Sequence, residues 1–247
     1  MTASVSILML THNAPSFVET SIRTVFERTQ GVRYELVVVD NASGEQTRQL
    51  VKKLRAEGLI DRLRLLEHNS FFAEGNNRAA DMASADATHF LLLNSDVEVR
   101  GVDWLDHLLK IHERGITAYG WVDGQFARVD GYCLLIDADL YRIHQLDEDH
   151  QWWWAITKLQ AKLLNEGFSV KGYKDHERYL HHFGGASGDG FKAARGMEVT
   201  EDQVEGWFAG KRPRKINGHI HAPGPGESPR RASNWLRRLM GRGFSAA

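Results

Sequence analysis

Cysteine and long apolar runs are scarce in this chain of 247 residues. The single cysteine, Cys133, excludes a disulfide framework and fits a reducing compartment, so we expect a cytoplasmic protein. No apolar run approaches the roughly 20 residues that a membrane-spanning helix needs. The amino-terminal sequence MTASVSILMLTHNAP lacks the basic start of a secretory signal, and polar residues from Thr11 onward interrupt it, which favours a first strand.

Glycine is missing from THNAPS, the turn that follows this first strand. A dinucleotide-dependent oxidoreductase needs a glycine-rich turn there, so that the backbone can approach the pyrophosphate. The sequence also lacks a Walker-type phosphate loop. A nucleotidyltransferase that makes a sugar nucleotide would need a loop rich in glycine and arginine at this place. These absences argue against a dinucleotide-dependent oxidoreductase, a protein with a Walker-type phosphate loop and a nucleotidyltransferase.

Positive charge is scarce in the body of the chain and concentrated at its end. The net charge is −1, but residues 211–247 have nine Lys and Arg side chains and one acid, Glu227, which gives +8 and leaves −9 for residues 1–210. Four of the five prolines also lie within residues 213–229. We therefore divide the chain into a domain of residues 1–210 and a tail of residues 211–247, which comprises an irregular linker and a short amphipathic segment.

The first hundred residues contain a regular alternation of strand and helix patterns. Strands are expected at residues 4–10, 34–39, 62–67 and 88–93, and helices from Pro15, through Leu50 and Leu54, and at residues 75–84. Near-continuous apolar strands predict an α/β fold with a mostly parallel central sheet and helices on both faces. Beyond residue 99 the pattern weakens, with helices expected at residues 102–113 and 152–166 and a strand at 131–136. We expect a nucleotide-binding half at residues 1–100 and an acceptor half at residues 101–210.

Each of the first four expected strands ends in side chains that form hydrogen bonds. These are Thr11-His12-Asn13, Asp40-Asn41, His68-Asn69-Ser70 and Asn94-Ser95-Asp96. The carboxyl ends of parallel strands meet at one edge of the sheet, so these groups are expected to converge on a nucleobase, a ribose and a diphosphate. Turn chemistry explains any one group equally well, but it explains all four together less readily.

Without a glycine-rich loop, a bound diphosphate needs another partner, and a divalent cation is the usual one. Asp96 follows the apolar residues LLL of the fourth strand. A lone carboxylate in such a place is a suitable ligand for a hard cation such as Mg²⁺ or Mn²⁺. We therefore expect Asp96 to bind a metal at this edge of the sheet.

Several stretches resemble the inverting family 2 glycosyltransferases of the GT-A fold, especially rhamnosyltransferase-like members that build bacterial surface polysaccharides. The resemblance covers residues 4–190 and is carried by ILMLTHNA, ELVVVDNASGEQT, HNSFFAEGNNRAADMASADATHFLLLNSD and HHFGGAS. It implies an enzyme that transfers a sugar from a UDP-, dTDP- or GDP-linked donor to a hydroxyl of a glycan or a lipid-linked acceptor, with inversion.

The resemblance also implies which residues bind the donor. In the family the first two strand-end turns and the acidic residue after the second strand hold the nucleotide base, which implies Thr11, Asn13 and Asp40 here. The family's AxGNNxG-like stretch resembles residues 73–77. Arg78 stands where glycine is frequent in that stretch, and an arginine there can pair with a phosphate. Combined with the strand ends, the expected nucleotide-sugar-binding residues are Thr11, Asn13, Asp40, Asn69, Asn77, Arg78, Asn94 and Asp96.

The metal site has two implied ligands. The triplet that ends in Asp96 resembles a variant of the family's Asp-x-Asp motif, whose last carboxylate binds the metal. His182 begins a match to the family's late His-x-x-Gly-x-Ser pattern, whose histidine completes the metal site, and His181 is the neighbouring alternative. Residue type alone favours an ordinary surface histidine, because the chain contains twelve histidines. The spacing of His182 to Gly185 and Ser187 favours a metal ligand instead.

The catalytic base is the part of the family pattern that the chain lacks. Inverting transfer needs a carboxylate that takes the proton of the acceptor hydroxyl. Ala155 and Ile156 occupy the places of the family's Glu-Asp pair. Asp149 is the nearest replacement, with Glu148 and Asp147 behind it, although any of the three can instead cap or charge the start of a helix. The alternative function is therefore a non-catalytic nucleotide-sugar-binding homologue that has lost its base.

Three consecutive tryptophans begin the helix expected at residues 152–166. They cannot all face one core, so at least one is expected on a cleft wall, where an indole can stack on an acceptor sugar. We assign Trp153 and Trp154 to this role, and packing in the core is the alternative for each.

The basic tail has two interpretations. It is either a solvated terminus or an interfacial segment, whose apolar side enters lipid headgroups while its arginines meet anionic phosphates. The second is favoured, and it predicts a protein on the inner face of the cell membrane. Nucleic-acid binding is not expected, because the body is acidic and no recognition motif accompanies the arginines.

Overall fold

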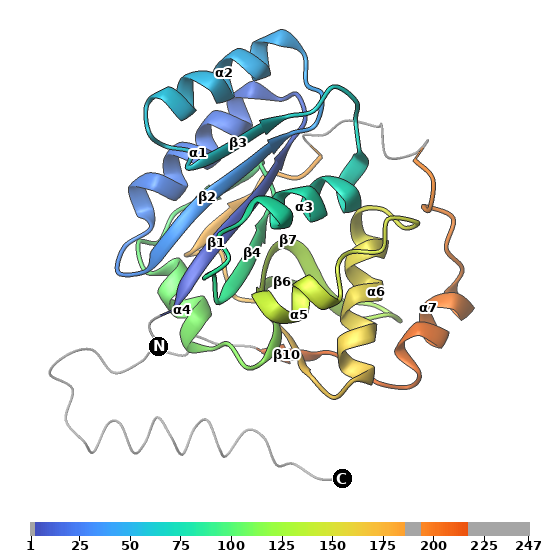
Figure 1. The fold of residues 1–247 in the computed structure, drawn as a ribbon. Helices are drawn as coiled ribbons and strands as arrows, with labels where there is room; N and C mark the ends of the chain where they lie inside the picture. The colour runs from blue at the N-terminus through green and yellow to red at the C-terminus, as the bar shows by residue number, and fades with distance from the viewer. Residues whose placement is uncertain (1–2, 186–193, 217–247) are drawn as a thin grey trace, which may run out of the picture. The chain divides into compact units, whose positions relative to one another are not determined.

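The computed structural model describes residues 3–185 and 194–216, which form alternating strands and helices (Figure 1). The strands are β1 (Ser4–Thr11), β2 (Arg33–Asp40), β3 (Arg62–Leu65), β4 (His89–Leu93), β5 (Val97–Val99), β6 (Gly115–Val122), β7 (Arg128–Asp137), β8 (Ser169–Tyr173), β9 (Leu180–His182) and β10 (Arg214–Ile216). The helices are α1 (Pro15–Arg28), α2 (Glu45–Ala56), α3 (Phe71–Met82), α4 (Trp104–Lys110), α5 (Ala138–Ile143), α6 (Trp152–Asn165) and α7 (Glu201–Phe208).

Eight of these strands form the central sheet, in the order β10-β8-β6-β7-β4-β1-β2-β3. β7 is antiparallel to both of its neighbours, β4 and β6, whereas the other five neighbouring pairs are parallel. The predicted α/β fold with a mostly parallel sheet is therefore confirmed.

Helices cover both faces of this sheet, as the sequence predicted (Figure 1). On one face α3, α5 and α6 pack over buried residues such as Leu8, Val39 and Leu92. Alternate residues of the same strands, such as Ile7 and Val38, are buried on the other face, where α1 and α2 lie. Both faces are thus apolar, which explains why the strands have continuous rather than alternating hydrophobic sequences.

The second half of the fold contains more strands than the sequence predicted. β6, β8 and β10 were not expected, and β10 lies inside the segment interpreted as an irregular linker. That interpretation is wrong for Arg214–Ile216, which pair with β8. A strand of three residues with two basic side chains is too short and too polar to show a hydrophobic pattern. The remaining tail, with its expected amphipathic segment, lies outside the described residues.

β5 and β9 form a separate two-stranded antiparallel sheet. Val97 is the register partner of His182, and Val99 is that of Leu180. This small sheet joins the segment directly after β4 to a segment far along the chain. It therefore determines which side chains meet beyond the end of β4.

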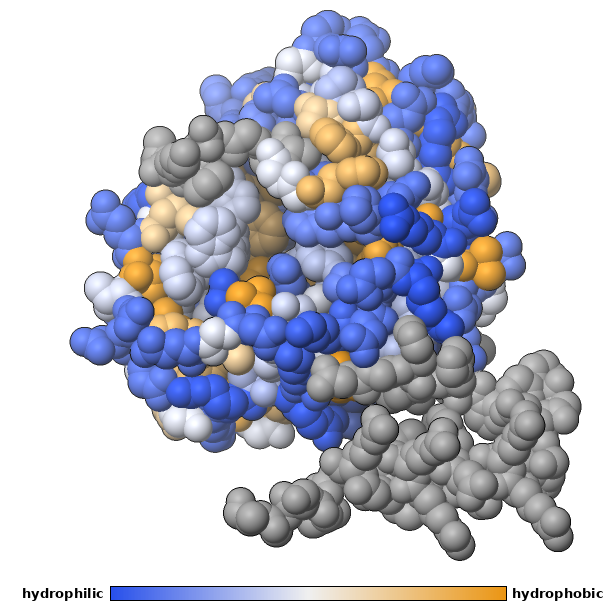
Figure 2. Space-filling model, turned by 180° about the vertical axis from the view of Figure 1, so that it is seen from behind, coloured by the Kyte–Doolittle hydropathy of each residue, from blue (hydrophilic) through white to orange (hydrophobic). Residues whose placement is uncertain are grey.

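The face of the molecule in Figure 2 is mainly hydrophilic, and the hydrophobic residues on it lie in small separate groups. None of the helices in residues 3–185 and 194–216 is long and apolar enough to span a bilayer. The expected contact between the tail and a membrane remains a prediction about residues outside these ranges.

Candidate functional site

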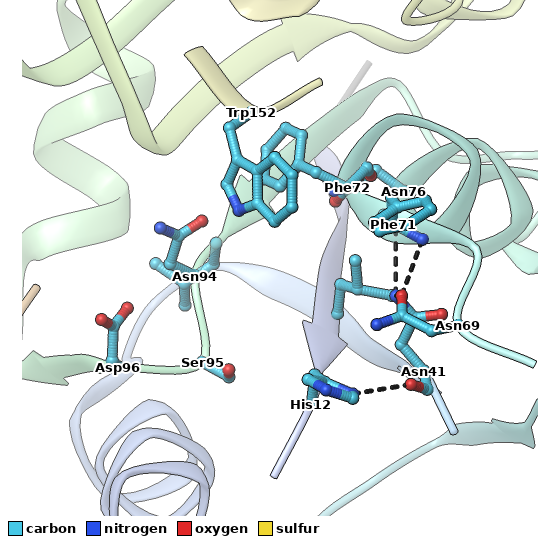
Figure 3. A pocket seen from close by; sticks show the side chains of 12 residues that line it. His12, Asn41, Asn69, Phe71, Phe72, Asn76, Asn94, Ser95, Asp96 and Trp152 are labelled. Atoms are coloured by element: carbon cyan, nitrogen blue, oxygen red, sulfur yellow. Dashed lines mark hydrogen bonds between the residues drawn. The ribbon is translucent and has the colours of Figure 1, made fainter. Parts of the chain in front are cut away.

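A pocket lies at the carboxyl ends of β1, β2 and β4, where the sequence predicted converging polar side chains (Figure 3). The residues that line it are Leu10, His12, Asn41, Asn69, Phe71, Phe72, Asn76, Leu93, Asn94, Ser95, Asp96 and Trp152. In open α/β sheets this edge is where ligands bind. Of the expected donor-binding residues, Asn69, Asn94 and Asp96 are in this lining.

Asn41 organises one wall of the pocket, and its side chain is almost fully buried. Its amide nitrogen donates to Asn69 Oδ1 at 2.8 Å and to the carbonyl of Phe71 at 3.1 Å. Its amide oxygen accepts from the backbone N–H of Ser70 at 2.7 Å. His12 donates from Nδ1 to the Asn41 carbonyl at 2.8 Å (Figure 3). This one asparagine thus ties the ends of β1, β2 and β3 to the start of α3.

Thr11 and Asp40 are buried beneath this wall instead of lining the pocket. The Thr11 hydroxyl donates to Asp40 Oδ1 at 3.1 Å, and Asp40 Oδ2 accepts from the backbone N–H of Ser43 at 3.1 Å. Asn13 is exposed, and its Oδ1 accepts from the backbone N–H of Gly44 at 2.9 Å. The three residues therefore shape the two turns that the sequence associated with a nucleotide.

Asp96 is the one carboxylate among the described residues that line the pocket, and it is 8% exposed. Its Oδ1 lies 3.3 Å from Nε2 of His182. Pairing of β5 with β9 positions both residues, and the backbone N–H of Phe183 donates to the Asp96 carbonyl at 3.0 Å. The structure thus brings together the two residues that the sequence predicted as metal ligands. Ser187, the end of the expected histidine pattern, lies outside the described residues.

Aromatic rings support His182 on its far side. Its imidazole stacks on Tyr132, with ring centroids 4.3 Å apart and planes 20° apart. Burial raises the pKa of Tyr132 well above its ordinary value, so this hydroxyl stays protonated. It donates to Nε2 of His176, whose Nδ1 donates to the carbonyl of Lys174 at 2.7 Å. The direction of each hydrogen bond is thereby fixed, and the chain of contacts orients the ring against which His182 packs.

The Asp96 and His182 pair fits a divalent cation by its chemistry and its spacing. Carboxylate oxygen and imidazole nitrogen both bind divalent metals. Two neighbouring ligands of an octahedral cation at about 2.1 Å lie about 3 Å apart. The observed separation of 3.3 Å is close to that value. Moreover, within residues 3–185 and 194–216 the pocket lining includes no lysine or arginine that could offset the charge of a diphosphate.

Aromatic side chains form another wall of the pocket. The rings of Trp152 and Phe71 meet edge to face, with centroids 6.2 Å apart (Figure 3). Both residues have positive φ, 46° and 57°, which is rare for bulky side chains and concentrates at functional sites. The sequence prediction missed Phe71, Phe72, Asn76 and Trp152. The available signal was the FF pair and the NN pair after the third strand and the tryptophan run itself.

The two tryptophans assigned to an acceptor lie outside this lining. Trp154 packs with Val204 and Phe208 of α7, and its Nε1 donates to the carbonyl of Met197 at 3.1 Å. Trp153 is 39% exposed. Successive helical positions point in different directions, and the first position of α6 is the one that faces the pocket. The tryptophan on the cleft wall is therefore Trp152.

The replacement candidates for the base are also outside the pocket lining. The carboxylate of Asp149 is 73% exposed and lies 3.0 Å from the guanidinium of Arg195. Glu148 accepts a hydrogen bond from Asn77 at 3.0 Å. Both carboxylates thus have partners at the turn before α6, and neither is presented to the pocket in this structure.

The positions that the family pattern reserves for the Glu-Asp pair are closed and apolar. Ala155 and Ile156 are buried in the core between α6 and the sheet. A Cβ on Gly131 of β7 would lie 2.8 Å from Ile156 Cγ1, so the isoleucine occupies the space directly over this glycine. Apolar packing has replaced the expected carboxylates here.

Asn77 and Arg78 make contacts within the fold. Asn77 Oδ1 accepts from the Tyr141 hydroxyl at 2.9 Å and from the backbone N–H of Leu146 at 3.0 Å, and Nδ2 donates to the Leu146 carbonyl at 2.9 Å. Arg78 pairs with Glu74, one turn earlier on α3. Asn77 therefore anchors the loop before α6, while its neighbour Asn76 lines the pocket.

Comparison with protein families identifies the class to which this fold and site belong. Residues 6–156 match the family described as Glycosyl transferase family 2. The match covers more than half of the chain, so the chain belongs to glycosyl transferase family 2. A comparison with curated proteins found no match.

Solved structures share the fold at low sequence identity. The mannosyltransferase PcManGT from Pyrobaculum calidifontis, in complex with GDP-Man and Mn²⁺, is 18% identical with a TM-score of 0.57, over 68% of this chain and 54% of that one. TarS 1–349 from S. aureus is 18% identical with a TM-score of 0.52, over 66% of this chain and 55% of that one. Its complex with UDP is 17% identical with a TM-score of 0.51, over 65% and 55%. The expected GT-A fold is confirmed, and the chain spans just over half the length of these relatives.

Proposed function

We propose that this protein transfers a sugar from a nucleoside diphosphate-sugar to a hydroxyl of a glycan or glycolipid, with inversion and with the help of Mg²⁺ or Mn²⁺. The observation that carries the proposal is the 3.3 Å approach of the Asp96 carboxylate to the His182 imidazole at the pocket. Family membership supports the reaction class. The presence of GDP-Man and Mn²⁺ in one structural relative, and of UDP in another, supports the kind of donor and cofactor.

The donor's nucleotide is expected along His12, Asn41 and Asn69, with its diphosphate toward Asn94 and Asp96. Asn69 offers its amide nitrogen to the pocket side, since its Oδ1 already accepts hydrogen bonds from Asn41 and Phe71. Thr11, Asn13 and Asp40 act by holding the turns that carry these residues. Asn77 and Arg78 have a different role in this proposal, because their polar groups bind Leu146 and Glu74.

A cation held by Asp96 and His182 would stabilise the negative charge of the departing diphosphate. The charges of the described residues support metal dependence. Among these residues the lining contains a carboxylate and no lysine or arginine, so a diphosphate would meet net repulsion from them without a cation. The chain's own groups would orient the donor, and the aromatic wall of Phe71 and Trp152 would exclude water beside it.

The acceptor is expected beyond Trp152, with Trp153 as an exposed aromatic residue near the start of the same helix. A glycan or lipid-linked acceptor of bacterial surface polysaccharide synthesis, with a rhamnosyl or another hexosyl donor, is the proposal that the family resemblance supports. The basic residues 211–247 would then hold the protein at the anionic inner face of the cell membrane.

A second candidate function is binding of a nucleotide-sugar without turnover. The buried Ala155 and Ile156 favour it, because they close the place where a base is expected. Asp149, the leading replacement, is paired with Arg195 and exposed to solvent. For catalysis, Asp149 or Glu148 would have to reach the acceptor hydroxyl after substrate binding.

Calorimetry with UDP-, dTDP- and GDP-sugars, with and without Mn²⁺, tests the proposed function. At least one donor should bind, and binding should weaken strongly without Mn²⁺ and in Asp96→Asn. Asp86→Asn, a change to an exposed carboxylate far from the pocket, is the matched control and should bind normally. Absence of binding by every donor, with the protein folded, would refute donor binding altogether.

Turnover separates the two candidate functions. Donor hydrolysis or transfer that is lost in Asp149→Asn, with binding intact, would support the enzyme and identify its base. Donor binding at full affinity with no turnover on any glycan or glycolipid acceptor would favour the non-catalytic homologue.

A further inference from the structure

Three potential metal ligands lie close together at the end of the sheet opposite the pocket, where β4 begins. They are His89 at the start of β4, His112 in the connection between α4 and β6, and Asp137 at the end of β7. His89 and Asp137 are register partners in the antiparallel pair β4–β7. The pocket lies beyond Leu93, four residues farther along β4, or about 13 Å at the usual rise of a strand.

The geometry of these three side chains suits a single ion. One ligand atom of each lies within 4.8 Å of one ligand atom of the other two. His112 Nε2 and Asp137 Oδ2 are 3.3 Å apart, and two ligands of a tetrahedral Zn²⁺ at about 2.0–2.1 Å are separated by nearly the same distance, about 3.3 Å. The imidazoles of His89 and His112 meet edge to face, with centroids 5.1 Å apart.

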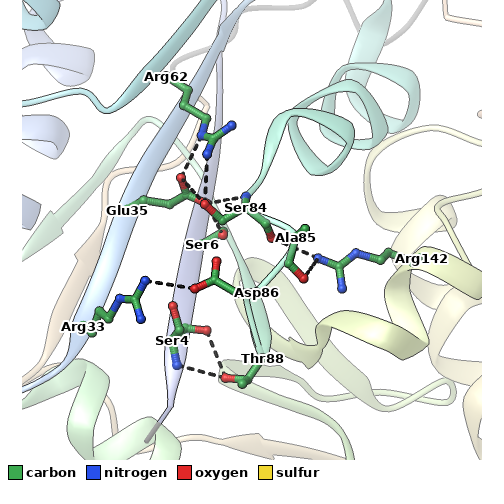
Figure 4. A network of polar contacts seen from close by, with 10 residues as sticks. All are labelled: Ser4, Ser6, Arg33, Glu35, Arg62, Ser84, Ala85, Asp86, Thr88 and Arg142. Atoms are coloured by element: carbon green, nitrogen blue, oxygen red, sulfur yellow. Dashed lines mark hydrogen bonds and ion pairs between the residues drawn. The ribbon is translucent and has the colours of Figure 1, made fainter.

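Threonine hydroxyls hold the far side of both imidazoles. Thr88 donates its hydroxyl hydrogen to the carbonyl of Ser4 at 3.0 Å, so its oxygen accepts from Nδ1 of His89 at 2.8 Å (Figure 4 shows Thr88 with Ser4). This leaves the lone pair of His89 on Nε2. His112 Nδ1 lies 3.0 Å from the hydroxyl of Thr117, and its Nε2 lies 3.3 Å from Asp137 Oδ2, where the two atoms form a hydrogen bond that a metal ion would replace. Metal-bound histidines are usually fixed by such a partner at the second ring nitrogen.

The ligand atoms are partly shielded from solvent. The side chain of His112 is 7% exposed and that of Asp137 is 15% exposed. Arg114 contacts Asp137 Oδ1 at 3.4 Å but makes a shorter contact of 2.6 Å with the exposed Asp139. Asp137 Oδ2 accepts from the backbone N–H of Gly115 at 2.7 Å, which orients this oxygen toward His112.

We propose that His89, His112 and Asp137 form a zinc-binding site separate from the donor pocket. Two imidazoles and one carboxylate favour Zn²⁺ over the hard cations Mg²⁺ and Ca²⁺, and a water molecule would complete four-coordination. Bound zinc would join the start of β4, the end of β7 and the α4–β6 connection. It would therefore stabilise the fold at the end of the sheet that is remote from the pocket.

The test is metal binding by the full chain after treatment with a chelator. Titration with Zn²⁺ by calorimetry, and with Co²⁺ by its visible absorption, should show a site that is lost in His89→Ala and in His112→Ala. Affinity should fall by more than about 100-fold in each, since loss of an outer partner alone costs about 10–100-fold. Asp96→Asn should retain the site, which separates this result from any failure of donor binding.

Two further variants keep the result interpretable. His219 and His221 can bind metal by themselves, and the variant His219→Ala/His221→Ala should leave the site intact. Arg114→Gln retains all three ligands and removes a positive charge beside Asp137, so it should bind Zn²⁺ more tightly than the wild type. Zinc binding that survives both His89→Ala and His112→Ala, or disappears only in the 219/221 variant, would overturn the proposal. If the histidine variants do not fold, unchanged or weaker binding of Zn²⁺ by Arg114→Gln would overturn the proposal.

Discussion

His182 stacks on Tyr132, with 4.3 Å between the ring centroids and 20° between the planes. The contact joins β9 to β7 and sets the direction of one of the two proposed metal ligands. Tyr132 is itself held by its hydrogen bond to His176. Metal affinity in the donor pocket should therefore depend on an aromatic ring that is not a proposed ligand.

Replacing Tyr132 by leucine should weaken the Mn²⁺-dependent part of donor binding by about 10-fold or more, because the imidazole loses its support. Tyr132→Phe keeps the ring and should lose much less. Calorimetry with the donor, at several Mn²⁺ concentrations, measures both effects. Equal Mn²⁺ dependence in Tyr132→Leu and the wild type would show that the stack does not position His182.

An ion pair with one buried member should make the β8–β10 side of the sheet sensitive to a single substitution. Lys171 on β8 is 3% exposed and lies 3.0 Å from the carboxylate of Glu113, which also binds Arg214 of β10 at 2.9 Å. Burial alone would raise the pKa of Glu113, but hydrogen bonds from Lys171 and Arg214 lower this pKa to about 2. Glu113→Gln leaves the buried ammonium of Lys171 without its counter-charge, and because the Glu113 side chain is itself 54% exposed, the free energy of unfolding should fall by about 1–2 kcal/mol.

Urea unfolding checks this prediction. The matched control is Glu205→Gln, which breaks an exposed pair with Arg212 and should cost less than about 1 kcal/mol. Similar losses in the two variants would mean that the Lys171 pair behaves as a surface pair.

Acid sensitivity is expected from His107, which lies among tyrosine rings in the core. Burial, and to a smaller extent the positive charge of Arg178, lowers the pKa of His107 to about 4. The Tyr119 hydroxyl donates to the carbonyl of Trp104 at 2.7 Å and accepts from His107 Nδ1 at 2.7 Å, so the neutral imidazole is the form that fits. Because the unfolded chain binds this proton more readily, the stabilisation is present above about pH 6.5 and is lost as the pH falls toward 4, with a limit of about 3 kcal/mol.

The variant His107→Phe preserves a ring beside Tyr179, which stacks on His107 at 4.5 Å. Its free energy of unfolding should vary less between pH 6.5 and pH 4 than that of the wild type. His68→Asn, at an exposed position, should follow the wild-type curve. An unchanged slope in His107→Phe would place the acid-sensitive group elsewhere.

The parts of the fold that the sequence predicted well are those in which local pattern and burial agree. β1 and β4 are continuous apolar segments that end in polar turns, and their carboxyl ends meet where parallel pairing requires. Asp96 and His182 came from motif spacing, while their contact depends on the pairing of β5 with β9. Strands of three residues have no period to detect, so this second step needed the structure.

The roles of neighbouring residues were harder to predict, because backbone direction decides them. Asn76 faces the pocket, whereas Asn77 binds the carbonyl of Leu146 inside the core. A helix turns about 100° at each residue, so an error of one position exchanges a lining residue for a structural one. The tryptophan run shows the same effect, since the residue on the pocket wall precedes the two that were assigned to the acceptor.

Substitution of the three tryptophans should therefore separate binding from stability. Trp152→Ala removes an indole from the pocket wall and should reduce donor or acceptor affinity, with a smaller effect on unfolding. Trp154→Ala removes the packing against α7 and the hydrogen bond to the Met197 carbonyl, and should lower the free energy of unfolding by about 3 kcal/mol. Trp153→Ala should change stability less than Trp154→Ala, since the side chain is 39% exposed. Calorimetry and urea unfolding on the same three proteins measure the two properties. A loss of affinity confined to Trp154→Ala would contradict the assignment of Trp152 to the pocket wall.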